Sequence, residues 1–84
     1  MTYDKLADLA AKTIIKVMQE GEVKHPENDY MDRPLTEHAK HAALHAQNAW
    51  SGMVFGFTGY DLKDELEHAL TRLAIVLAKM EGEE

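Results

Sequence analysis

The sequence predicts an all-α domain of three helices, near residues 3–20, 34–52 and 61–81. In each of these segments apolar residues recur at helical spacing; residues 21–33 between the first two contain glycine, proline, asparagine and aspartate, and glycines separate the second from the third. The second and third segments also share an alternation of four- and three-residue steps. This shared rhythm predicts an antiparallel helical hairpin with the first helix packed across it, in a single domain spanning residues 1–84.

The first segment has the pattern of an amphipathic scaffold helix. Charged residues run along the side opposite the apolar stripe, and Asp8 precedes Lys12 by the four residues that favour an ion pair. Thr2 is placed to cap the start and Gly21 to end the helix. The expected buried stripe is Leu6, Leu9, Ala10, Thr13, Ile14 and Val17.

The stretch from Gly21 to Arg33 predicts a long loop. Loops of this length in small domains often carry function. Pro34 then suits the first turn of the second helix, where its missing N–H would be unpaired anyway. The loop gathers three cations and an aromatic side chain that are candidates for contact with a ligand: Lys24, His25, Arg33 and Tyr30.

Two patterns overlap in the second helix. One is a packing seam made mostly of alanine, which permits close approach of a partner helix: Leu35, Ala39, Ala42, Ala46, Ala49 and Met53. The other is a strip of polar side chains expected beside that seam: His38, His41, His45 and Asn48.

The third helix is expected to complete the hairpin. Asp61 and Asp64 resemble a capping box at its start. Its large side chains should fill the space left by the alanines of the second helix, along the seam Leu62, Leu66, Ala69, Leu73, Val76 and Met80. Antiparallel pairing would then bring Glu65, His68 and Arg72 beside the histidines, as a polar edge of the hairpin.

Glycines 52, 56 and 59 interrupt an apolar turn between the second and third helices. Large apolar side chains near that turn predict a contact with the core, another subunit or a partner: Trp50, Phe55 and Phe57. Because a chain of 84 residues buries only a modest core, we expect a homo-oligomer.

Composition narrows the classes of function. With 45% hydrophobic and 29% charged residues the chain should fold, and its formal charge of −6 argues against nonspecific nucleic-acid binding. The absence of cysteine excludes disulfides, thiolate metal sites and cysteine nucleophiles. No stretch has the length of a membrane span or the pattern of a signal peptide, which predicts a cytoplasmic protein without membrane contact.

Three interpretations of the polar residues stay open. A divalent metal ion could be held by His41, His45, Glu65 and His68, since Glu-x-x-His is a spacing used by metal-binding bundles. Alternatively, a small anionic ligand such as a nucleotide could be held by Lys24, His25, Tyr30, Arg33, His38 and Arg72. In the third interpretation the histidines form a solvated helix edge, with Glu65 and Arg72 in ordinary ion pairs.

Two stretches, KHPENDYMDRPLTEHAKHAALH and DELEHALTRLAIVL, resemble small bacteriophage proteins of the dATP/dGTP diphosphohydrolase-like family, over roughly residues 20 to 78. The resemblance singles out Lys24, Tyr30, His41, His45, Glu65, His68 and Arg72. Tyr30 stands where that family usually has tryptophan, and the paired Glu-x-x-Glu and Glu-x-x-Asp metal motifs of helical nucleotide pyrophosphohydrolases are missing.

The resemblance therefore implies a phage protein of the host cytoplasm that binds a nucleotide without hydrolysing it, such as one that sequesters a defence signalling nucleotide. A metal-dependent nucleotide phosphohydrolase is the first alternative. An acidic inhibitor that binds another protein is the second.

Overall fold

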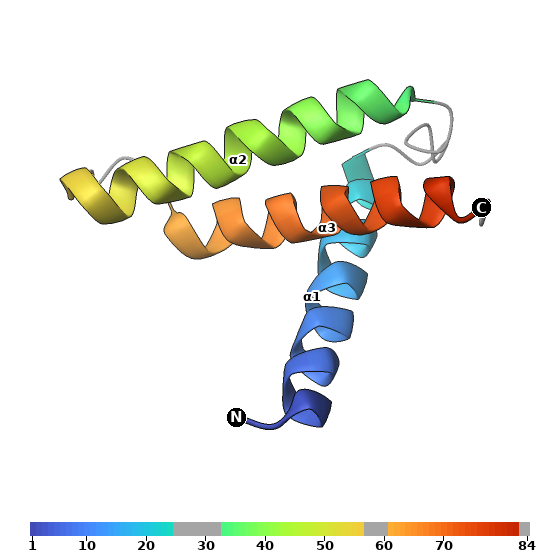
Figure 1. Ribbon diagram of the computed structural model, residues 1–84, viewed down its shortest axis with the longest axis horizontal. Helices are drawn as coiled ribbons and strands as arrows, with labels where there is room; N and C mark the ends of the chain where they lie inside the picture. Colours follow the sequence, from blue (N-terminus) through green and yellow to red (C-terminus); the bar gives the residue numbers. More distant parts are fainter. Residues whose placement is uncertain (25–32, 57–60, 83–84) are drawn as a thin grey trace.

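The computed structural model describes residues 1–24, 33–56 and 61–82. Their three helices are α1 (Tyr3–Lys24), α2 (Leu35–Phe55) and α3 (Leu62–Met80), and no strand occurs among these residues. Figure 1 shows α2 and α3 side by side and antiparallel, with α1 crossing α3 steeply. The predicted fold class, a helical hairpin with the first helix packed across it, is confirmed.

The helix starts follow the predicted capping residues. The Thr2 hydroxyl accepts a hydrogen bond from the Lys5 N–H at 3.3 Å, and the Asp61 carboxylate accepts one from the Asp64 N–H at 3.1 Å. Pro34 lies one position earlier than expected, as the N-cap of α2, where no side chain caps the helix. Local sequence signals thus set where two of the three helices begin.

Two glycines that were expected to end helices lie inside them. α1 continues through Gly21 to Lys24, and α2 continues through Gly52 to Phe55. α2 ends at Gly56, whose φ of 70° is the left-handed conformation that glycine adopts without strain. Gly52 has a packing role instead, because the Leu62 side chain occupies the position that a Cβ at residue 52 would take.

The packing seam of the hairpin differs from the predicted one. On α2 the buried residues are His38, Ala42, Ala49 and Gly52, whereas Ala39, Ala46 and Met53 of the predicted seam are exposed. Ala42 and Ala49 are buried as predicted, but His38, His45 and Gly52 take the places expected for Ala39, Ala46 and Met53. The small side chains at 42, 49 and 52 let the backbones approach, and the hydrogen bonds of the histidines to α3 make their burial tolerable.

The seam of α3 is displaced in the same way. Leu66, Leu73 and Met80, predicted to fill the space above the alanines, are 44%, 50% and 69% exposed. The positions that touch α2 include Leu62, Glu65 and Arg72, and Lys79 contacts the Arg33 carbonyl just before α2. The apolar side chains buried in the described part of the chain are consequently three alanines, Ala42, Ala49 and Ala69.

Only part of α1 packs on the hairpin. Its predicted stripe is half-buried from Ala10 onward, whereas Leu6 and Leu9, predicted to be buried, are exposed. Figure 1 gives the reason, since the N-terminal half of α1 projects away from α2 and α3. The Lys16 ammonium meets the Glu67 carboxylate at 2.9 Å, and this hydrogen bond raises the pKa of Lys16 above its usual 10.5.

Within the described residues, none of the helices combines the length and the apolar character that crossing a membrane requires.

Candidate functional site

A buried polar pair joins the first turn of α2 to α3. His38 is the largest side chain that is fully buried, and its Nδ1 lies 2.8 Å from Nη1 of Arg72. Because a guanidinium can only donate, the Nδ1 of His38 must accept, which leaves the ring proton on Nε2. The pair links α2 to α3, so the predicted approach of the histidine strip to Arg72 is confirmed, but in the seam rather than at its edge.

A second polar cluster lies two turns further along α2. Nδ1 of His45 and Oε2 of Glu65 are 2.6 Å apart, and the Asn48 amide donates to Oε1 of the same carboxylate at 3.4 Å. The ring of His68 stands 5.2 Å from that of His45 between centroids. Since Glu65 receives hydrogen bonds on both oxygens, it fixes the orientation of the His45 ring.

The residues predicted to bind a metal are only partly brought together. His45, Glu65 and His68 are neighbours, whereas Nε2 of His41 lies 3.8 Å from Glu37 on the same helix. His68 directs its Nδ1 to the backbone carbonyl of Asp64 at 2.9 Å. Among residues 1–24, 33–56 and 61–82, no group of three or more histidines and carboxylates is arranged to hold a metal ion.

Two basic residues, Arg33 and Lys79, lie together at the start of α2. Lys79, near the end of α3, donates to the backbone carbonyl of Arg33 at 3.2 Å, and the Arg33 guanidinium meets Glu37 at 3.1 Å. Lys24 is the last residue of α1. Sequence reasoning missed Lys79, although it follows Arg72 by seven residues and so shares its side of α3.

The other residues predicted to bind a ligand have different positions. His25 and Tyr30 lie outside the described residues. His38 and Arg72 are engaged with each other between α2 and α3, and the fully buried His38 ring has no surface for a ligand to touch in this conformation. Of the predicted ligand set, Arg33 is therefore the member whose described side chain lies at the α2 start and is only half-buried.

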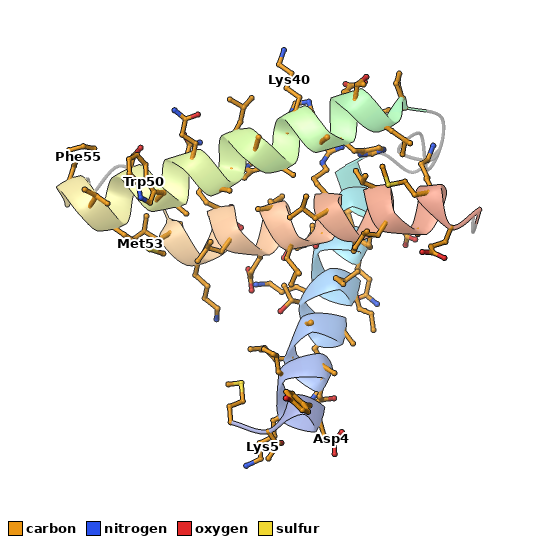
Figure 2. All side chains as sticks on the ribbon, in the orientation of Figure 1. Asp4, Lys5, Lys40, Trp50, Met53 and Phe55 are labelled. Atoms are coloured by element: carbon orange, nitrogen blue, oxygen red, sulfur yellow. The ribbon has the colours of Figure 1, made fainter. Side chains whose placement is uncertain are left out.

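The aromatic residues predicted to form an interface are on the surface. Trp50 and Phe55 are 60% and 63% exposed and meet edge to face, with ring centroids 6.3 Å apart. Figure 2 places both at the C-terminal end of α2, with Met53 beside them. Phe57, the third predicted member, lies outside the described residues.

Comparison with protein families, with characterised proteins and with solved structures found no match for this chain.

Proposed function

We propose that the chain binds a small phosphate-bearing ligand, with a nucleotide as the leading candidate, and does not turn it over. The binding region is the start of α2, where the Lys79 ammonium contacts the Arg33 backbone carbonyl and where the stretch that follows Lys24 ends. The observation that carries this proposal is the contact of Lys79 with the Arg33 backbone, because it places a cation from α3 beside Arg33.

The charge distribution supports this region. The whole chain has a formal charge of −6, so a phosphate would be repelled by most of its surface. At the α2 start, Arg33 has a planar fork of donors, of which Nη1 contacts Glu37, and Lys79 is a point charge; proteins use both kinds of group for phosphates. The first turn of α2 is not capped by a side chain, and its helix dipole favours an anion at the same place.

Binding without turnover suits sequestration of a signalling nucleotide, the role that the resemblance to small phage proteins implies. In this role Tyr30 would stack on the base and His25 would add a donor to phosphate. His38 and Arg72 would support ligand binding indirectly and not by touching the ligand. Their pairing holds α2 against α3 and so keeps Arg33 near Lys79.

Isothermal calorimetry against linear and cyclic nucleotides, with inorganic phosphate as a minimal probe, tests the proposal. Lys24→Gln and Arg33→Gln should each weaken nucleotide binding about tenfold or more, the usual loss for one charge-assisted hydrogen bond. Lys5→Gln is the matched control, because it removes the same charge from the opposite end of α1, where Figure 2 shows Lys5. Absence of binding to every phosphate-bearing probe would remove the proposal.

The adjacency of His45, Glu65 and His68 favours one alternative, a metal-dependent nucleotide phosphohydrolase. Metal binding would require the Glu65 carboxylate to exchange its bond to His45 for the ion. Incubation of the purified protein with Mg²⁺ or Mn²⁺ and a nucleotide separates the two functions, because product release that is lost in His45→Ala supports the enzyme. Nucleotide recovered intact, with no metal retained, supports binding alone.

A further inference from the structure

An uncharged apolar stripe runs along the outside of each helix of the hairpin. On α2 it consists of Ala39, Ala43, Ala46, Trp50 and Met53, and on α3 of Leu66, Leu70, Leu73, Leu77 and Met80, all of them exposed. These positions carry no charge in a chain of which 29% is charged, and their steps of four and three are those of helix packing seams. A contiguous apolar surface of this kind is typical of a contact site and not of a helix face that only meets water.

The two stripes face the same side of the hairpin. Ala39 and Ala46 each follow a seam residue of α2 by one, and Leu66 and Leu73 do the same on α3. Successive side chains on a helix are rotated by about 100° around its axis. Because the two helices run in opposite directions and their seams face each other, the side chains that follow the seam residues point to the same face of the hairpin. Glu67, which pairs with Lys16 of α1, lies one residue further round, so α1 packs on another side of α3.

The exposed area is larger than a compact chain needs. The chain exposes 6335 Å², whereas a compact monomer of 9.5 kDa exposes about 5,000 Å². The excess of about 1,300 Å² exceeds the roughly 800 Å² that each partner contributes to a standard protein interface. The small buried core points the same way, since the apolar side chains buried in the described residues are alanines.

We propose that this face binds a second copy of the chain, with the α3 leucines of each copy packed on the α2 alanines of the other. The complementarity of size selects this occupant, because large side chains lie beside small ones on a single surface. A two-fold axis parallel to the helices brings α3 of one copy onto α2 of the other in antiparallel orientation. The result is a four-helix bundle in which α1 of each copy lies on the outside.

The pairing has a defined register. Within the hairpin, His38 lies level with Arg72 and His45 with Glu65. Rotation about a two-fold axis parallel to the helices does not change the height of any residue along that axis. Leu66 of each copy therefore lies at a height between Ala43 and Ala46 of the other. A negative charge at position 66 and a positive charge at position 46 would therefore meet across the interface, and each charge alone would be buried against an apolar surface.

Sedimentation velocity and light scattering at micromolar concentration, with helicity measured by circular dichroism, test the proposal. The wild type should be a dimer. Leu66→Glu should weaken dimerisation about a hundredfold or more, the usual cost of burying an unpaired charge. Leu44→Glu is the matched control, since Leu44 is 46% exposed and Leu66 44%, but Leu44 lies outside both stripes; it should remain a dimer.

Mixing Leu66→Glu with Ala46→Lys distinguishes this pairing from any other. Each variant alone should be monomeric or lose helicity, and the equimolar mixture should recover a helical heterodimer through one charge pair and one unaltered half-interface. The proposal is overturned by a monomeric wild type, by a Leu66→Glu dimer as stable as that of Leu44→Glu, or by a mixture that stays dissociated. Capture of a different protein by a monomeric chain would likewise assign the face to that partner.

Discussion

Gly21 lies inside α1 although its sequence position is typical of a helix end, and it has no packing reason to be glycine. A Cβ built at this position meets no atom within 4 Å. Gly21→Ala should therefore raise the free energy of unfolding by about 0.5–1 kcal/mol, because alanine loses less backbone entropy in a helix. Urea unfolding followed by circular dichroism measures the change.

Gly56 provides the control for this substitution. It has a φ of 70° at the end of α2, where an added Cβ also meets no atom within 4 Å, so space cannot distinguish it from Gly21. Gly56→Ala should lower the free energy of unfolding by about 1 kcal/mol because an L residue is strained there. Equal effects at the two positions would show that backbone conformation is not the cause.

The pair of His38 and Arg72 predicts strong coupling between two buried residues. His38→Leu and Arg72→Met should each cost about 2–4 kcal/mol in unfolding free energy, because each leaves its partner's polar group buried without this contact. The double variant should cost less than the sum of the two, since both polar groups are then gone. Additive losses in chemical unfolding would contradict an energetic link between these side chains.

At the scale of the helices, sequence periodicity predicted where each helix lies better than which face it buries. The starts near Tyr3, Leu35 and Leu62 follow from capping and proline signals that act within a few residues. Two alternatives one residue apart compete on α2, however, beside the shared Ala42 and Ala49: one has Ala39 and Ala46, and the other has His38 and His45. Which of them packs within the chain depends on partners 20 to 34 residues away, Glu65 and Arg72, and local spacing cannot weigh those contacts.

The same limit applies to the candidate site. Sequence spacing predicted that His45, Glu65 and His68 would meet, and they do. It did not predict Lys79 beside Arg33, because Lys79 contacts a backbone carbonyl, which has no residue signature. The burial of His38 was likewise unexpected, since a histidine is usually assigned to the polar side of an amphipathic helix.

The contact between α1 and α3 has a predictable dependence on pH. The hydrogen bond to Glu67 raises the pKa of Lys16, so folding favours the protonated ammonium. The stability that Lys16 contributes should be fully present below pH 10.5, its usual pKa, and be lost as the pH rises through the higher value of the folded state. The stability difference between the wild type and Lys16→Met should therefore fade in strongly alkaline solution.

Lys12→Met is the comparison for this measurement. Lys12 pairs with Asp8 at 2.8 Å within α1, where both side chains are well exposed, so its removal should change stability little at any pH. Unfolding curves collected from neutral to alkaline pH for the two variants give the result. If Lys16→Met is still less stable than the wild type by the same free energy at the highest pH, the loss comes from packing of the side chain and not from its charge.

At the scale of the whole molecule, the distribution of apolar side chains connects stability to assembly. The described core is built from alanines and two polar side chains, His38 and Thr71, while five large apolar residues of α3 are exposed. If those residues are buried only between two copies, most of the hydrophobic stabilisation belongs to the dimer. The thermal midpoint of unfolding should then depend on protein concentration.

A tenfold increase in concentration should stabilise the dimer by about 1.4 kcal/mol, since association enters the folding equilibrium by mass action. Circular dichroism melts over a hundredfold range of concentration should show a steadily rising midpoint for the wild type and for Leu44→Glu. Leu66→Glu should show a lower midpoint that does not vary, because its α3 stripe can no longer be covered by a second copy. A wild-type midpoint independent of concentration would mean that the chain folds alone, with the leucines in water.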